Sequence, residues 1–551
     1  MESGIRQNEW LNARGSDQIT ILKKQAVAGD VQAIRNLADS YYHGIQGAPK
    51  DNYSAFYWYE YATQFGEAQD LYRLGICHQF GIGTRYDRDK AVHYYQLAAQ
   101  SGHPRAQYEM GIAYDYGIAV EKDEDTACEY YRMAAEQGDA KAQCALGYNY
   151  EVGISVEEDI EKASELYRLS AAQGYSYAQC NLGYFYDLGI GVKKDLVKAA
   201  HLYELAARQG HRRALYNLGY FYEYGLGVEK DETRATELYL ASAKQGYEFA
   251  QHAIGRCYMY GIGVTLDYDQ AAHYFMLAAE QGNARALCDI GFCYEKGYGV
   301  EQNYDKAIEN YQKAADKGND CAQCNLGFLY NRGCGVKQDL EKSIQLYQMS
   351  ADQGFARAQF NLGWCYHYGV GVEKNADKAF EYYQMSAKQD YDLAIYNLAY
   401  AYQHGDITNK NIMEAIRLYM ILAKRGDDDA QCNLGYIYAE SEDIPHDYDK
   451  AVFYYRQAIE HGNAVALCNL GDCYEKGHGV EQDYQLAVEY YQKAADKGND
   501  CARYSLGYCY ENGWGVKQDL DKALSLYKQA MDQGYQDAKE SYEKLKKQLK
   551  K

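Results

Sequence analysis

The chain has 551 residues, of which 47% are apolar and only 3 are proline, so it can bury apolar cores and has few forced helix breaks, which excludes collagen-like and proline-rich disordered chains. It carries 57 Lys and Arg against 78 Asp and Glu, a net charge of -21. Such a surface repels phosphate backbones, so a neutral to basic polypeptide is a better partner than nucleic acid or an anionic membrane, although the charge also serves solubility alone.

The N-terminal part of the chain shows no sign of export. Residues 1–20 lack an apolar core followed by a small-residue cleavage site, and no stretch reaches the roughly 18 apolar residues of a spanning helix. We therefore expect a cytoplasmic protein without membrane insertion, and non-classical secretion stays open. A helix is expected near residues 17–28, within an N-terminal capping segment over residues 1–29.

A repeat of fixed length organises the rest of the chain. The pair Leu-Gly, or a close variant, recurs every 36 residues from Leu74-Gly75 to Leu506-Gly507, and an earlier copy at Leu37-Ala38 is offset by one residue. This predicts about fourteen repeats over residues 30–535 and a C-terminal capping helix over residues 536–551. A fixed period of this size is typical of a solenoid, in which each unit buries its apolar face against its neighbours.

The repeat over residues 178–210 shows how one unit folds. Ala178 and Leu182 begin a four-residue apolar spacing that predicts a first amphipathic helix, and Ala199 and Tyr203 begin a second. The fold class is therefore an all-α solenoid of helical hairpins. A glycine in mid-helix, such as Gly183, costs about 1 kcal/mol relative to alanine, so it is expected where the partner helix comes close.

Turn residues separate the two helices. Gly189 and Gly191 fit a left-handed helix end and a tight turn, Asp195 is placed to cap the second helix, and Gly210 can end it. These signals break down between residues 390 and 445, where Asp390 replaces a terminal glycine and two turns lose glycines. A local change of superhelical geometry and neutral drift in an exposed loop both remain open.

The combined pattern A-x-x-x-L-G-x-x-Y-x-x-G-x-G-V, then D-x-x-K-A-x-x-Y-Y-x-x-A-A-x-Q-G, resembles the Sel1-like repeat family, relatives of the tetratricopeptide repeats. The resemblance covers essentially residues 30–540. It implies a right-handed α/α superhelix with the first helix of each hairpin on the concave surface, and adaptor or scaffold work on peptides or partner proteins. The strict 36-residue unit and the low proline content suit a bacterial member.

Reactive residues give no catalytic or metal pattern. Twelve of the 16 cysteines occupy two helix positions, which favours reduced, partly buried thiols over a disulfide ladder. Cys321 and Cys324 form the one C-x-x-C, without a second pair or a nearby histidine to complete a zinc set. We predict no enzyme activity, no metal and no cofactor.

The first helices carry the candidate binding residues. Asparagine often stands just before the repeat leucine, aromatic residues stand two positions after it, and acidic residues such as Asp115, Glu151 and Asp187 stand five after it. The partner-binding candidates are Asn181, Asn217, Asn325, Asn361, Asn397, Asn433, Asn469, Tyr184, Tyr220, Phe328, Trp364, Tyr400 and Tyr436. Amides can hold a peptide backbone, and an aromatic stripe beside an acidic one suits apolar and basic side chains. An amide ladder between neighbouring first helices explains the asparagines equally well, and packing between adjacent first helices explains the aromatic residues equally well.

Two functions remain open from the sequence. The first is a non-catalytic scaffold that holds a polypeptide in the concave groove. The second is a secreted effector-like or structural repeat protein that acts through its convex or terminal surfaces. Substitutions in the groove would abolish partner capture in the first case and leave it unchanged in the second.

Overall fold

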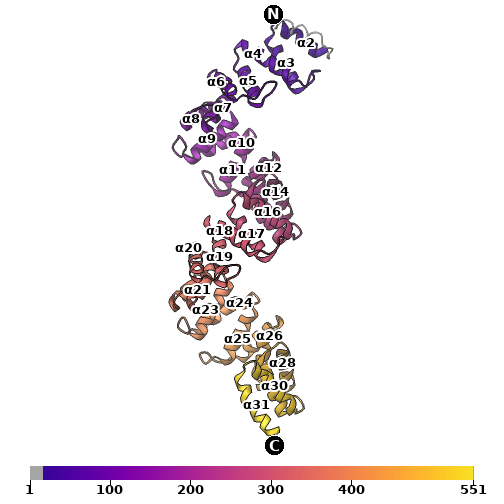
Figure 1. Cartoon of the computed structure of the whole chain (residues 1–551), viewed down its shortest axis with the longest axis vertical. Helices are drawn as coiled ribbons and strands as arrows, with labels where there is room; N and C mark the ends of the chain where they lie inside the picture. The colour runs from indigo at the N-terminus through magenta and orange to yellow at the C-terminus, as the bar shows by residue number, and fades with distance from the viewer. Residues whose placement is uncertain (1–16, 550–551) are drawn as a thin grey trace. The chain divides into compact units, whose positions relative to one another are not determined.

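The computed structural model describes residues 17–549, so the prediction for residues 1–16 lies outside the described part of the chain. Over residues 17–549 the chain is all α apart from one short 3-10 helix, with no β-strand. It divides into two compact units, residues 1–283 and residues 284–551. Within each unit the helical hairpins follow one another in chain order (Figure 1). The expected all-α solenoid of helical hairpins is confirmed.

Unit 1 contains helix α2 (Asp17–Val27) and seven hairpins. Their first helices are α3 (Val31–His43), α5 (Ala68–Phe80), α7 (Pro104–Tyr116), α9 (Ala140–Val152), α11 (Ser176–Leu188), α13 (Arg212–Tyr224) and α15 (Glu248–Tyr260). Their second helices are α4 (Asn52–Ala62), α6 (Arg88–Gln100), α8 (Glu124–Glu136), α10 (Ile160–Ala172), α12 (Leu196–Arg208), α14 (Glu232–Ala243) and α16 (Tyr268–Glu280). The 3-10 helix η1 (Thr63–Phe65) follows α4.

Unit 2 contains seven further hairpins and ends with helix α31 (Gln536–Leu549). Its first helices are α17 (Ala284–Lys296), α19 (Asp320–Arg332), α21 (Ala356–Tyr368), α23 (Asp392–His404), α25 (Asp428–Glu440), α27 (Ala464–Lys476) and α29 (Asp500–Asn512). Its second helices are α18 (Tyr304–Asp316), α20 (Leu340–Asp352), α22 (Ala376–Ala387), α24 (Ile412–Lys424), α26 (Tyr448–Glu460), α28 (Tyr484–Asp496) and α30 (Leu520–Asp532).

The turn residues act as the sequence predicts. Gly189 ends α11 in the left-handed conformation with φ 78°, and Gly191 and Gly210 also have positive φ. The carboxylate of Asp195 accepts a hydrogen bond of 3.0 Å from the backbone N–H of Lys198, which caps α12. Gly189 and Asp195 thus satisfy backbone groups at the end of α11 and the start of α12.

The mid-helix glycine marks the closest approach of the two helices. A Cβ atom on Gly183 would lie 2.9 Å from the ring of Tyr203 and 3.4 Å from the carbonyl oxygen of Ala199, both on the partner helix. Tyr203 is fully buried, so its ring has no room to withdraw. The prediction for this glycine is confirmed, and the same contact between glycine and tyrosine recurs in other hairpins.

The irregular turns between residues 390 and 445 leave the flanking helices at their usual length. Asp390 takes the left-handed conformation of the glycine it replaces, with φ 61°. Asp406, in the second turn, places a carboxylate oxygen 3.0 Å from Nε2 of the buried His367, and the neighbouring Ile407 is buried. After α25, Ser441 is extended with φ -73°. In the turn after α23, the side chains of Asp406 and Ile407 therefore make contacts where a turn glycine is missing.

Over residues 17–549, no helix combines the length and the apolar character that crossing a membrane requires.

Candidate functional site

The predicted binding residues all lie on the surfaces of first helices. The asparagines are half-buried, as are Tyr184 and Trp364. The other aromatic candidates are more exposed, from 42% for Tyr400 to 48% for Tyr436. These positions flank the buried repeat leucine, so solvent reaches them while the helix remains packed. We call the surface that they share the first-helix face.

Three of the asparagines bond to the preceding first helix. The amide of Asn433 donates to the Tyr396 hydroxyl at 2.9 Å, and Asn361 donates to the sulfur of Cys324 at 3.5 Å. Asn325 donates to the sulfur of Cys288 at 3.7 Å. These three asparagines thus join neighbouring first helices through phenol and thiol groups and not through an amide ladder. Asn397 instead donates to the carbonyl oxygen of Leu393 in its own helix, at 2.7 Å.

The acidic residues of the first helices do not form the free stripe that the sequence suggested. The Tyr239 hydroxyl donates to Glu223 at 2.8 Å, and both side chains are buried. The same bond, from a second-helix tyrosine to a first-helix acid, joins Tyr131 to Asp115, Tyr167 to Glu151, Tyr311 to Glu295, Tyr491 to Glu475 and Tyr527 to Glu511. Burial raises the pKa of Glu475. These carboxylates therefore link the two helices of their hairpins and are not free groups. Asp187, which the sequence places in the same stripe, is half-buried and has no such bond among the described residues.

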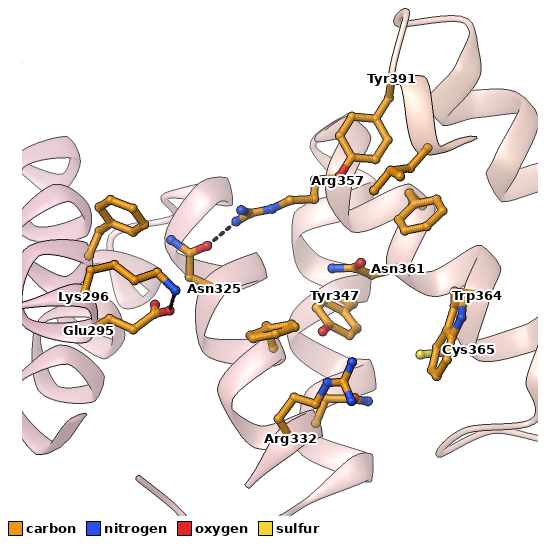
Figure 2. A pocket seen from close by; sticks show the side chains of 15 residues that line it. Glu295, Lys296, Asn325, Arg332, Tyr347, Arg357, Asn361, Trp364, Cys365 and Tyr391 are labelled. Atoms are coloured by element: carbon orange, nitrogen blue, oxygen red, sulfur yellow. Dashed lines mark hydrogen bonds and ion pairs between the residues drawn. The ribbon is translucent and has the colours of Figure 1, made fainter. Parts of the chain in front are cut away.

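A cleft of about 550 Å³ opens on the first-helix face of unit 2 (Figure 2). Its walls come from α17, α19, α20 and α21, with a contribution from the start of α23. We call it the Arg357 cleft. It is lined by Phe292, Glu295, Lys296, Asn325, Phe328, Asn331, Arg332, Tyr347, Arg357, Phe360, Asn361, Trp364, Cys365, Tyr391 and Leu393. Four predicted residues, Asn325, Phe328, Asn361 and Trp364, meet here, and the remaining nine candidates lie elsewhere.

The walls of the Arg357 cleft are largely aromatic. The ring of Trp364 lies 5.2 Å from that of Tyr368, and the ring of Phe360 lies 5.5 Å from that of Tyr391. Leu393 adds an aliphatic side chain that is 53% exposed. Rings held by their neighbours lose little freedom when a ligand binds, so this wall is preorganised for an apolar side chain.

Arginine and lysine side chains bring positive charge to the same cleft. Arg357 donates from its terminal nitrogen to the carboxamide oxygen of Asn325, a bond that is visible in Figure 2. The Nε of Arg357 is buried and has no hydrogen-bond partner among residues 17–549. Lys296 is bonded to Glu295 at 2.6 Å, which neutralises it. The charge of Arg357, by contrast, has no carboxylate partner among the ion pairs of the described chain.

Sequence reasoning missed Arg357. It stands five residues before the repeat leucine, a position that Arg105 and Arg213 share in unit 1. A search for cations that recur at one repeat position would have identified it. In unit 1, a second cleft of about 580 Å³ contains Asn181 and Arg213. There the guanidinium carbon of Arg213 lies 5.2 Å from the ring centroid of Tyr184.

Cysteines supply the other reactive groups, and all 16 are free thiols. The residues that the structure describes contain no group of three or more His, Cys, Asp or Glu side chains arranged to hold a metal ion. Cys288 and Cys321 form a hydrogen-bonded pair, in which Cys288 has a raised pKa and Cys321 a lowered one. Cys468 and Cys501 repeat this arrangement. Both pairs join neighbouring first helices.

Comparison with known proteins agrees with the repeat geometry. The Sel1 repeat matches residues 31–64, 68–103, 104–139, 140–175, 176–211, 212–247, 249–283, 284–319, 322–355, 356–391, 392–427, 428–463, 464–499 and 502–535. A protective antigen present in uropathogenic Escherichia coli, which displays an SLR fold, is 31% identical with a TM-score of 0.56. The match covers 89% of this chain and 97% of the antigen.

A second solved structure, a Sel1 repeat protein from Oxalobacter formigenes, is 33% identical with a TM-score of 0.40. The match covers 44% of this chain and 96% of that protein. A comparison with curated proteins gives no match.

Proposed function

Since the chain belongs to the Sel1 repeat family, we propose that it is a non-catalytic scaffold that binds a polypeptide partner on its first-helix face. Repeats of this kind typically mediate interactions between proteins. The observation that carries the proposal is the Arg357 cleft, in which rigid aromatic walls and amide groups from successive repeats open to solvent together.

Asn361 and Trp364 are the residues expected to contribute most to binding. They stand three residues apart on α21 and line the same cleft, so one partner segment reaches both. A half-buried tryptophan beside hydrogen-bonding groups is the usual composition of an interaction hot spot. We propose that Trp364 anchors an apolar side chain of the partner while Asn361 reads its backbone.

The charge of the protein acts on the partner in two ways. At long range the net charge of -21 favours a partner that is neutral to basic overall. Inside the cleft the local charge is positive, because the side chains there include Arg332 and Arg357. We propose that partner selection combines both effects.

The test is capture of partners from native lysate with the wild type and with the N361A/W364A variant. The variant is expected to bind the captured partner at least about 2 kcal/mol more weakly, roughly thirtyfold, with unchanged helical circular dichroism. F453A is the matched control, since Phe453 is an exposed aromatic residue on the second helix α26, outside the first-helix face. Capture of the same partners at the same strength by the double variant would overturn the proposal.

A second function is favoured by one comparison. The related Escherichia coli protein is described as a protective antigen, which suggests for this chain a secreted or surface role through its outer or terminal surfaces. Labelling of intact source cells with an antibody against this chain would detect it there. If the antibody labels only permeabilised cells, this alternative is wrong and the cytoplasmic scaffold is supported.

A further inference from the structure

The guanidinium of Arg357 is a partly buried cation whose hydrogen-bonding capacity is not used up. Its hydrogen bonds within the described chain run to uncharged groups, the carboxamide oxygen of Asn325 and the thiol of Cys324, and its buried Nε has no partner there. Leaving a donor of a charged group unsatisfied away from water is costly. An arginine in this state is suited to an anion that arrives from outside.

In unit 1, an arginine at the same repeat position binds a carboxylate that the protein itself supplies. Arg105 stands at the same repeat position as Arg357. Its terminal nitrogen donates to both carboxylate oxygens of Asp139, at 3.1 and 2.9 Å. Asp139 lies 34 residues later, at the residue that caps the next first helix, α9. The arginine of one repeat is thus neutralised by the N-cap aspartate of the next.

At the corresponding N-cap after Arg357 in unit 2, a tyrosine stands in place of the aspartate. Tyr391 lies 34 residues after Arg357, at the N-cap of α23, and its side chain makes no capping hydrogen bond. Tyr391 lines the Arg357 cleft with the arginine (Figure 2). The substitution therefore removes the internal carboxylate at the point where the cleft opens. Unit 1 has the same change at Arg213, whose counterpart 34 residues later is Tyr247.

We propose that the Arg357 cleft binds the side-chain carboxylate of an aspartate or glutamate in a polypeptide partner. The carboxylate takes the place at Arg357 that Asp139 takes at Arg105, and an adjacent apolar side chain of the partner packs against Trp364 and Phe360. A side chain is the source of the carboxylate because the internal group at Arg105 is an aspartate side chain. The inference rests on the proposed function and specifies the ligand of that same site.

The surrounding groups support an acidic ligand. Glu295 is the one acid that lines the cleft, and it is already bonded to Lys296 and to the Tyr311 hydroxyl. Arg332 has its guanidinium carbon 5.9 Å from the ring centroid of Phe328 and takes part in no ion pair of the described residues. The cleft is therefore locally positive within an acidic protein, so it attracts a carboxylate.

The test uses capped peptides as probes. Each is an N-acetylated, C-amidated pentapeptide with a central Asp or Glu flanked by pairs of Leu, Val, Phe and Trp, and each has a twin with Asn or Gln at the centre. Binding to the full chain is measured by calorimetry at low salt. At least one acidic peptide is expected to bind about tenfold or more tightly than its amide twin, the scale of a charge-assisted hydrogen bond.

Two variants locate that preference. In R357Q the ratio between acidic and amide peptides should fall to about one. In Y391D the new aspartate should occupy the site as Asp139 does at Arg105, so acidic peptides should lose their advantage. Because aspartate also caps a helix better than tyrosine, Y391D should fold at least as well as the wild type. R105Q is the control, and it should keep the full preference.

Three outcomes would overturn the inference. The first is that the wild type shows no preference for acidic peptides, and the second is that the preference survives in R357Q. The third is that amide peptides with a free C-terminal carboxylate bind more tightly than the capped acidic peptides, which would assign the site to chain termini. If acidic and amide peptides bind equally and N361A/W364A weakens both, the inference fails and the scaffold function stands. If no peptide binds and the double variant captures the same partners as the wild type, the scaffold function fails too.

Discussion

The hydroxyl of Tyr311 donates a hydrogen bond of 2.9 Å to the carboxylate of Glu295, across the two helices of one hairpin. Both side chains are buried, so the bond forms where water is largely excluded. The bond therefore matters for folding stability mainly because its loss would leave a buried carboxylate or hydroxyl without a partner.

Tyr311→Phe should lower the free energy of unfolding by about 1–2 kcal/mol, because it leaves a buried carboxylate with one bond fewer. Tyr203→Phe is the matched control. Tyr203 is equally buried, but its hydroxyl donates to no carboxylate and has only the amide of Asn217 beside it. Loss of this hydroxyl should therefore cost less stability than loss of the Tyr311 hydroxyl. Urea denaturation followed by circular dichroism measures both, and equal losses would contradict the assignment of the bond.

Alanine in place of the mid-helix glycine should destabilise each hairpin in proportion to the clash. A Cβ atom would lie 2.6 Å from the ring of Tyr95 at Gly75, but 3.0 Å from that of Tyr167 at Gly147. The gain in helix propensity is about 1 kcal/mol at either site, while overpacking costs about 1–3 kcal/mol. We expect G75A to lose more stability than G147A in thermal unfolding. The reverse order would show that helix propensity, and not packing, determines the change in stability.

Acid should destabilise unit 1 through His211. Burial, followed by the charges of Arg213 and Arg212, lowers the pKa of His211 to about 4. Its neutral Nδ1 accepts a hydrogen bond of 3.2 Å from the backbone N–H of Ala214 and so caps α13. Since the unfolded chain binds the proton at about pH 6.5, this contribution to stability is complete above that pH and is lost as the pH falls toward 4.

The slope should approach about 1.4 kcal/mol per pH unit between these values. H211N keeps a capping group but cannot titrate, so its stability should vary less over the same range. Urea denaturation at several pH values measures the difference. An identical pH profile for H211N would contradict the assignment to this histidine.

Cys501 should be alkylated faster than Cys509. A hydrogen bond from the Cys468 thiol lowers the pKa of Cys501 to about 7, whereas burial raises that of Cys509 to about 12. The thiolate is the reactive form. Cys501 should therefore react with iodoacetamide at pH 7 much faster than Cys509, as followed by peptide mass spectrometry. In C468A the reaction at Cys501 should slow, and an unchanged rate would contradict the role of the Cys468 thiol.

The sequence predicted the helices and turns well because each depends on residues close together in the chain. Asp195 caps α12 and Gly183 faces Tyr203 as expected, since both relationships lie within one hairpin. The bonds of the first-helix acids were not predicted, because residue spacing does not show that Glu223 accepts a hydrogen bond from the Tyr239 hydroxyl. Arg357 was missed because its state depends on Tyr391, in the next repeat, and a comparison within one repeat does not connect the two.

The N-cap position of a first helix carries an aspartate after Arg105 and a tyrosine after Arg357. The codons of tyrosine and aspartate differ in a single base, so one mutation interconverts the two arrangements. Neither residue is part of the buried contact between glycine and tyrosine that sets the helix spacing. An array of this kind can therefore gain or lose a charged cleft in one genetic step, repeat by repeat, while its fold is inherited unchanged.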